Sequence, residues 1–233
     1  MRSIVWFRND LRVRDNPALA EACARGDVTA VTCLCPDQLR AHDVGPMRIA
    51  FLLRSLDALS RDLGSLGVAL KIIERPRFAD LPEALVDFAR KEGATHLEFN
   101  DEYPLDERRR DAAVADACAA AGIAVGRHVA DCTLAPGTVL TKSRSPYTVF
   151  SPFRRRWLEC VDAAQLTPID TPQRRAGESA GDPVPATLDG VSADFGDSLW
   201  PAGEAAAQKA LKRFVSGPVL DYCLLYTSDA ADE

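Results

Sequence analysis

Residues 3–35 read SIVWFRNDLRVRDNPALAEACARGDVTAVTCLC and contain the pattern that decides the fold. The β-branched and aromatic residues at 3–7 predict a short buried strand. The Asn-Pro pair at 16–17 suits the N-cap and the first position of a helix, and Gly26 is a typical helix end. A second apolar run at 28–35 predicts another strand. Because a helix connects the two strands, they are expected to lie parallel in one sheet.

The same alternation of strand and helix continues to about residue 130. Further helices are expected at 46–64, 82–91 and 106–121, and further strands at 69–73, 96–99 and 123–129. The helix at 46–64 has the clearest pattern, because its apolar residues fall on a single stripe. Strands that alternate with helices form a parallel sheet that is covered on both faces. We therefore predict a doubly wound α/β domain with five parallel strands at residues 1–130.

The regular pattern ends after residue 130. Turn-forming residues at 136–146 surround an extended segment, and a short helix is expected at 153–164. Residues 167–203 are rich in Pro, Gly, Asp and Ser, which is typical of a long linker. An amphipathic helix is expected at 204–222, as the first helix of an all-α domain. The predicted divisions are an interdomain segment and linker at 131–199, the start of a helical domain at 200–222, and a tail at 223–233.

Two charged loops are the best candidates for a functional site. Ligands of open α/β sheets bind at the carboxyl ends of the strands, where the strand order reverses. If the order is 3-2-1-4-5, this point lies between the first and fourth strands, at loops 8–12 and 100–104. The alternative is a structural role, in which the first loop is held by ion pairs among Arg8, Asp10, Arg12 and Asp15.

Several classes of protein are excluded by their missing motifs. The turn after the first strand has no glycine, and neither a Gly-x-x-x-x-Gly-Lys nor a Gly-x-Ser-x-Gly sequence occurs, which argues against dinucleotide enzymes, P-loop enzymes and hydrolases. The 7 Cys and 3 His are scattered, so we expect neither a disulfide framework nor a metal site. The net charge of −6 does not suggest binding to nucleic acid through overall charge. The apolar runs are too short for a signal peptide or a membrane span, so we expect a cytoplasmic protein that does not enter a membrane.

Residues 4–19, IVWFRNDLRVRDNPAL, closely resemble the opening signature of DNA photolyases and cryptochromes. The family usually has His or a similar residue where Arg14 stands. Further segments agree with the family in order and spacing, although Ser151 replaces its usual Thr. These segments are 51–56, 101–111, 146–157, 200–204 and 211–222, so that the resemblance spans residues 3–222.

The resemblance implies a Rossmann-like N-terminal domain of a deoxyribodipyrimidine photolyase, cut off as the flavin domain begins. Photolyases are carbon–carbon lyases that repair pyrimidine dimers in DNA by light-driven electron transfer from reduced FAD, and an antenna pigment harvests the light. Damaged DNA is the implied partner, contacted through the helical domain, and the full-length protein is expected to be a monomer. One alternative is a cryptochrome, a blue-light photoreceptor without repair activity. A weaker alternative is a stand-alone α/β module that binds a nucleotide or a flavin.

The resemblance implies cofactor contacts for three residues of this chain. Photolyases with a folate antenna bind the pterin through an Asn-Glu pair, and Asp106 and Glu107 stand at that place. A carboxylate at Glu107 can accept hydrogen bonds from pterin N–H groups, or it can simply be an acid stabilised by the helix dipole. Glu107 matches the family pair, so that 5,10-methenyltetrahydrofolate is the favoured antenna; Asp106 departs from the Asn, so that a deazaflavin is the alternative. Tyr222 stands where the family places a Tyr against FAD.

The sequence departs from the family after Tyr222. Residues 223–233 read CLLYTSDAADE and do not continue the family pattern, so we interpret them as a non-native tail. The rest of the FAD site and the pocket for the dimer would follow in the family. We therefore expect no catalytic residue in this chain and no repair activity from it.

Overall fold

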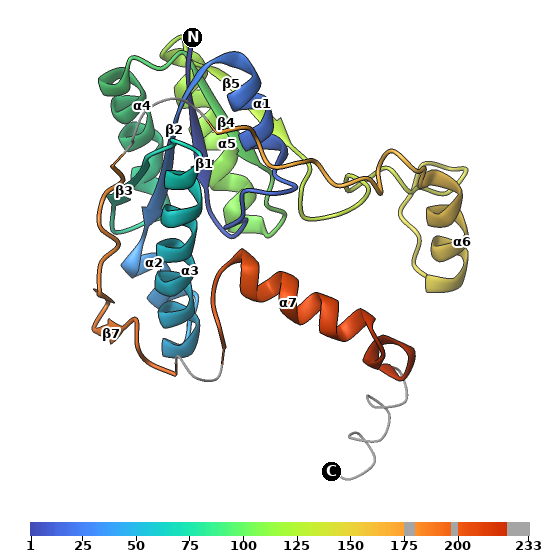
Figure 1. The fold of residues 1–233 in the computed structure, drawn as a ribbon. Helices are drawn as coiled ribbons and strands as arrows, with labels where there is room; N and C mark the ends of the chain where they lie inside the picture. The colour runs from blue at the N-terminus through green and yellow to red at the C-terminus, as the bar shows by residue number, and fades with distance from the viewer. Residues whose placement is uncertain (175–179, 197–199, 223–233) are drawn as a thin grey trace.

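The structure is a computed structural model that describes residues 1–174, 180–196 and 200–222. Its centre is a parallel sheet of five strands, and the sheet order is β3-β2-β1-β4-β5 (Figure 1). The strands are β1 (Arg2–Phe7), β2 (Asp27–Leu34), β3 (Leu70–Glu74), β4 (His96–Asn100) and β5 (Ala124–His128). This order confirms the predicted doubly wound sheet and places the reversal of strand order between β1 and β4.

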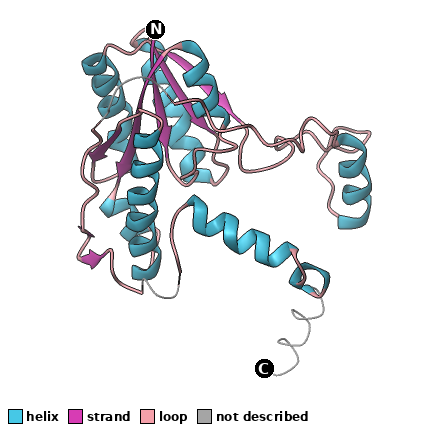
Figure 2. Cartoon of the chain, in the orientation of Figure 1, coloured by secondary structure: helices cyan, strands magenta, loops and turns pink. Residues whose placement is uncertain are grey.

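Helices cover both faces of the sheet (Figure 2). One face carries α1 (Pro17–Arg25) and α3 (Pro46–Ser65), and the other carries α4 (Leu81–Glu92) and α5 (Leu105–Ala120). The side chains of β1 alternate between these two layers, since successive residues of a strand point to opposite faces. Val5 and Phe7 pack with α1 and α3, whereas Ile4 and Trp6 pack with α4 and α5. None of these four residues is more than 1% exposed, as expected for the central strand of a parallel sheet.

Both ends of α1 lie at residues that favour helix termini. The side chain of Asn16 accepts a hydrogen bond of 3.1 Å from the backbone N–H of Leu19, and Pro17 occupies the first turn. Gly26 ends the helix with φ of 155°, a conformation that side chains rarely adopt. A Cβ atom at Gly26 would also lie 2.3 Å from the carbonyl oxygen of Met1. Only glycine fits this position without moving the backbone.

Several smaller elements differ from the expectation. A short helix, α2 (Pro36–Ala41), follows β2, and a two-stranded hairpin of β6 (Thr187–Leu188) and β7 (Val191–Ser192) lies within the predicted linker. The helix α6 (Phe150–Cys160) begins before Pro152. Proline is tolerated there, because the N–H groups of the first turn have no hydrogen-bond partner within the helix, so that no bond is lost. The helix α7 (Glu204–Val215) ends earlier than expected, and a 3-10 turn (Pro218–Leu220) follows it. Pro218, with no N–H to donate and a fixed φ, suits the start of a new turn.

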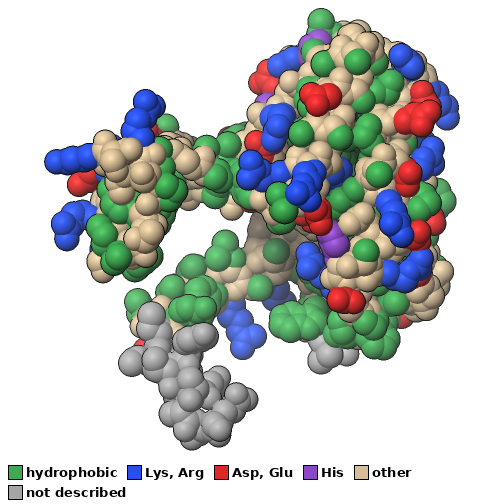
Figure 3. Space-filling view, turned by 180° about the vertical axis from the view of Figure 1, so that it is seen from behind, with side chains coloured by type: hydrophobic (Ala, Val, Ile, Leu, Met, Phe, Trp, Pro, Cys, Tyr) green, Lys and Arg blue, Asp and Glu red, His purple; other side chains and the backbone are tan. Residues whose placement is uncertain are grey.

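The described part of the predicted linker lies against the α/β layer. The Asp182 carboxylate accepts hydrogen bonds of 3.0 Å from the backbone N–H of Ile72 and from Nζ of Lys71. Leu188 is 4% exposed and belongs to the core beneath α3, and the Arg54 guanidinium donates to carbonyls of the same segment. By contrast, α6 forms a separate lobe with its cations grouped on the outer side (Figure 3). Within the ranges that the structure describes, no helix combines the length and the apolar character that crossing a membrane requires.

Candidate functional site

The two charged loops meet at the carboxyl ends of β1 and β4, and Asn100 joins them. Its Nδ2 donates to Asp10 Oδ2 at 2.6 Å and to Asn16 Oδ1 at 2.9 Å. Its Oδ1 accepts from the backbone N–H of Ala18 at 3.2 Å. The Asn100 residue is 2% exposed, and both ends of its amide are satisfied. It therefore fixes the first loop and the start of α1 against β4.

A cluster of four buried charges lies beside Asn100. Arg110 Nη2 is 2.6 Å from Glu102 Oε2 and 2.7 Å from Asp111 Oδ1, and Arg8 Nη1 is 3.3 Å from the same Asp111 oxygen. The four side chains are at most 6% exposed. Buried charges are tolerated when they are paired, and this cluster contains two of each sign. Burial alone would raise the pKa of Glu102, but the guanidinium groups of Arg8 and Arg110 together hold it below its ordinary value.

The ion pairs predicted within the first loop were wrong in their partners. The backbone N–H of Arg8 donates to Asp10 Oδ1 at 2.9 Å, and the Arg12 guanidinium donates to the carbonyls of Asp15 at 2.8 Å and Ala130 at 3.3 Å. These four loop residues, all within the described part of the chain, form no ion pair with one another. The partners of Arg8 come instead from the β4–α5 loop and from α5. Spacing within the loop could not show them, because Asp111 is 103 positions away.

Aromatic rings contact the guanidinium groups of Arg8 and Arg110. Arg8 Cζ lies 4.5 Å from the centre of the Trp6 ring, and Arg110 Cζ lies 4.9 Å from it. Phe99 meets the Trp6 ring edge-on at 5.5 Å, and Phe78 lies 4.7 Å from Arg110 Cζ. Cations within about 6 Å of an aromatic ring are attracted to its face. The two guanidinium groups therefore contact aromatic rings as well as carboxylates.

A cavity of about 450 Å³ opens at the carboxyl ends of β1 and β2, and we call it the sheet cavity. Ligand pockets in proteins commonly have volumes of about 300–1,000 Å³. The Cys33 and Cys35 thiols lie in its wall, and burial raises the pKa of Cys33 to about 12 and that of Cys35 to about 11. Both thiols are therefore protonated at neutral pH and are weak nucleophiles. The cavity is lined by Arg8, Asn9, Thr32, Cys33, Leu34, Cys35, Gln38, Leu39, His42, Val44, Arg48, Leu52, Phe78, Glu107 and Arg110.

The structure separates the predicted site residues. Glu107, in the first turn of α5, lines the sheet cavity. Asp106 faces α2 instead, where its Oδ2 is 3.3 Å from His42 Nε2, and its Oδ1 is 3.4 Å from Arg109 Nη1. Tyr222 is 56% exposed and lies edge-on to Phe214 at 5.7 Å, away from both.

Sequence reasoning missed two groups in the wall of the sheet cavity, namely His42 with the short helix α2 and Arg48 in the first turn of α3. The six residues of α2 are too few to show an apolar period. Arg48 reads in the sequence as an ordinary surface cation. The charges on loops 8–12 and 100–104, together with the family resemblance at Glu107, were the signals that pointed to this edge of the sheet.

A second cavity of about 780 Å³ lies between the first loop, α3 and α7, and we call it the helix cavity. It shares Asn9, Arg48 and Leu52 with the sheet cavity. At its edge, Glu204 Oε2 accepts from the backbone N–H groups of Val13 at 2.8 Å and Arg14 at 3.3 Å. The first residue of α7 thus binds the loop that follows β1.

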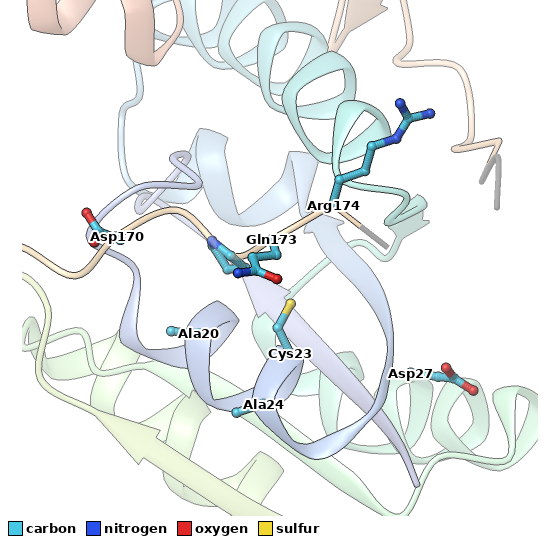
Figure 4. A pocket seen from close by; sticks show the side chains of 8 residues that line it. Ala20, Cys23, Ala24, Asp27, Asp170, Gln173 and Arg174 are labelled. Atoms are coloured by element: carbon cyan, nitrogen blue, oxygen red, sulfur yellow. The ribbon is translucent and has the colours of Figure 1, made fainter. Parts of the chain in front are cut away.

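A third cavity, of about 590 Å³, lies against α1 (Figure 4). Its polar side chains do not converge, since Asp27 and Arg174 extend away from its centre in different directions (Figure 4). Asp27 begins β2, so the cavity lies toward the amino end of the sheet. Ligands of open α/β sheets bind at the opposite end. The sheet cavity is the better candidate for a site.

The protein is thus a doubly wound α/β domain with a cavity at the carboxyl edge of its sheet. The sequence model of the DNA photolyase family matches residues 3–173, and the chain belongs to that family. It is 33% identical over 232 residues to a deoxyribodipyrimidine photo-lyase of Salmonella typhimurium, which covers 98% of this chain and 49% of the relative. It is 32% identical over 227 residues to cryptochrome-1 of Arabidopsis thaliana, which covers 94% of this chain and 33% of the relative.

Solved structures agree with this family. The crystal structure of a bacterial class III photolyase from Agrobacterium tumefaciens matches with a TM-score of 0.74 and 28% identity, over 93% of this chain and 45% of that one. The chain thus spans about half of that photolyase, and about half or less of the two curated relatives. Photolyases and cryptochromes both occur among its relatives.

Proposed function

We propose that this chain is the antenna-side half of a deoxyribodipyrimidine photolyase, and that its sheet cavity holds the light-harvesting pigment. The whole protein would then split pyrimidine dimers in DNA, with electrons from reduced FAD and light energy collected by the pigment. Membership of the DNA photolyase family supports this proposal, as does the identity of 33% to the photo-lyase of Salmonella typhimurium.

The observation that carries the proposal is that the residues lining the sheet cavity include both a buried hydrogen-bond donor and a carboxylate acceptor. Arg8 lines the cavity and its side chain is 5% exposed; its Nε lies 4.0 Å from Glu102 Oε2 and has no hydrogen-bond partner among the described residues. A buried donor of this kind is stabilised when a ligand supplies an acceptor. Glu107 supplies a hydrogen-bond acceptor, because its carboxylate can accept from N–H groups of a pterin or flavin ring. The wall therefore holds both a donor and an acceptor for one ring system.

The residues of this chain would bind and orient the pigment, which supplies absorption of near-ultraviolet or violet light. Glu102 and Asp111 keep the Arg8 and Arg110 guanidiniums in place, so that little reorganisation is needed on binding. Glu107 would accept from the ring at the wall. Asp106 would act at the rim, where it faces His42. Because Glu107 matches the family's folate-binding pair, 5,10-methenyltetrahydrofolate is the first choice of pigment, and because Asp106 is not an Asn, a deazaflavin is the second.

Tyr222 remains the proposed contact to FAD. The three cavities described above do not include it, and within the part of the chain that the structure describes its aromatic neighbour is Phe214. The described residues around Tyr222 therefore do not by themselves form an FAD site. The cryptochrome alternative rests on the match to cryptochrome-1, and repair of thymine dimers by the full-length protein would separate the two functions.

The proposal can be tested by titrating the purified chain with 5,10-methenyltetrahydrofolate and following its fluorescence. Binding to the wild-type chain is expected, and Glu107→Ala should weaken it about tenfold or more, as for the loss of a charged hydrogen bond. Glu83→Ala is a matched control, because Glu83 is an exposed acid in the first turn of α4. Equal weakening by both variants would show a general loss of stability and not the loss of a contact in the cavity. No binding of either a folate or a flavin pigment would contradict the proposal.

A further inference from the structure

We propose that Glu204 is a positioning residue, which fixes the start of α7 on the loop that follows β1 and so sets the orientation of α7 against the sheet. The inference concerns the alignment of two parts of the chain and needs no pigment. It rests on the proposed function only for its consequence: in a photolyase, this contact would help to set the separation between the pigment in the sheet cavity and the flavin of the helical domain.

The Glu204 carboxylate bridges the loop and its own helix. Its Oε2 accepts from the backbone N–H groups of Val13 at 2.8 Å and Arg14 at 3.3 Å. Its Oε1 accepts from Gln208 Nε2 at 2.8 Å, one turn further along α7, which holds the carboxylate in place. Hydrogen bonds to an ionised acceptor are about twice as strong as those between neutral groups. One side chain thus makes the contact between α7 and the loop strong and directional.

The loop that Glu204 binds is itself tied to the sheet. Asp10 Oδ2 accepts from Asn100 Nδ2 at 2.6 Å, and Asn100 belongs to β4 and is 2% exposed. Further along the loop, Asn16 Nδ2 donates to the carbonyl of Arg12 at 3.1 Å. The N–H groups that Glu204 binds are therefore presented by a backbone that is already held, so that little order has to be gained when they are bound. Through this loop, the position of α7 is referred to the carboxyl end of β4.

The residue before Glu204 brings the chain close to α3. Gly203 has φ of 92°, in the region that side chains rarely adopt, and a Cβ atom there would lie 2.6 Å from Cβ of Ala58 in α3. Arg54, one turn earlier in α3, donates from Nη2 to the carbonyl of Trp200 at 3.5 Å. The chain therefore enters α7 at a point where only glycine fits, directly before the carboxylate that binds the loop.

Beyond its first turn, α7 has little support from the layer. None of its 12 residues is buried, and the helix extends away from the sheet (Figure 1). Burial raises the pKa of Asp62 in α3, and the nearby Glu204 carboxylate raises it further. Since these two acids repel each other, attraction to α3 does not explain where the Glu204 carboxylate lies. The N–H groups of the loop do, and the orientation of α7 depends on them.

The first measurement is amide hydrogen exchange, followed by NMR in the whole 233-residue chain without pigment. Glu204→Ala should speed exchange at the amides of Val13 and Arg14 about tenfold or more, as for the loss of a hydrogen bond to a charged group. Glu204→Gln keeps an acceptor oxygen and should restore part of the protection. Glu83→Ala is the matched control, because Glu83 is an exposed acid in the first turn of α4, and it should leave both amides unchanged.

The second measurement is the orientation of α7 against β1, from residual dipolar couplings of the same samples. In the wild-type chain the two elements should share one alignment, whereas in Glu204→Ala the couplings of α7 should shrink and those of β1 should not. Gly203→Ala should have the same effect with Glu204 intact, because the added Cβ displaces the start of the helix. Protected amides in β1 show that a variant is folded, and Glu204→Gln carries the test if Glu204→Ala is not.

Unchanged exchange at Val13 and Arg14 in Glu204→Ala overturns the assignment of Glu204. So does an equal increase in Glu83→Ala, or an α7 that stays aligned with β1 in every variant. Because no pigment is present, these results are independent of the titration of Glu107→Ala. The role of Glu204 stands if pigment binding fails, and the proposed function stands if the role of Glu204 fails.

Discussion

The carboxyl end of the sheet differs from the helices α6 and α7 in how far the side chains are buried and paired. At the sheet, Arg8, Glu102, Arg110 and Asp111 are buried and pair with one another. In α6 and α7 no side chain is buried, and large apolar residues such as Phe150 at 71% and Leu211 at 61% remain exposed. The α/β layer therefore completes its own core, whereas α6 and α7 add little to it. Stability should accordingly depend on the layer, and ligand binding on the edge where its strands end.

The largest expected effect comes from breaking the buried charge cluster. Asp111→Ala leaves the guanidiniums of Arg8 and Arg110 with a single carboxylate, and removing one member of a buried pair costs about 3–5 kcal/mol. The free energy of unfolding in urea measures this loss. Asp87→Ala, at a side chain that is 67% exposed in α4, should change it by less than about 0.5 kcal/mol. A loss below about 1 kcal/mol in Asp111→Ala would mean that the cluster does not stabilise the sheet edge.

The next effect compares two leucines in the two regions. Leu53 of α3 is 1% exposed, and Leu53→Ala is expected to lower the free energy of unfolding by about 2–5 kcal/mol. Leu211 of α7 is 61% exposed, and Leu211→Ala should change it by about 0.5 kcal/mol or less. Similar losses in the two variants would show that α7 belongs to the same cooperative unit as the sheet.

The smallest expected effect is a dependence on pH. Burial alone would raise the pKa of Glu102, but Arg8 and Arg110 lower it below 4.5 in the folded chain. A depressed carboxyl pKa stabilises the fold at any pH above the unfolded value, and this contribution disappears as pH falls through the folded value. The difference in unfolding free energy between wild type and Glu102→Gln should therefore be constant above about pH 5 and shrink at lower pH. A difference that grows on acidification would contradict this account.

The layer was predictable because its pattern is local. Apolar strand residues such as Ile4 to Phe7, and the helix start at Asn16 and Pro17, act over a few positions. The sheet order followed only as a conditional expectation, which the structure confirms. The hairpin at 187–192 was missed because each of its strands has two residues, too few to show alternation.

The site was predictable only in part. Loop 8–12 was placed correctly at the reversal of strand order, but the partners of Arg8 depend on contacts between distant segments that no spacing rule shows. The position of Glu107 in the cavity wall follows the family resemblance. His42 and Arg48 could not be found from sequence, since each becomes a wall residue only when the ends of α2, α3 and α5 meet at the carboxyl edge of the sheet.

The most direct test of the central claim is a crystal structure of the chain grown with 5,10-methenyltetrahydrofolate. We predict the pterin ring in the sheet cavity, with its N–H groups within hydrogen-bond distance of the Glu107 carboxylate. A ring bound against α1, or at any surface away from the carboxyl ends of β1 and β2, would contradict the account.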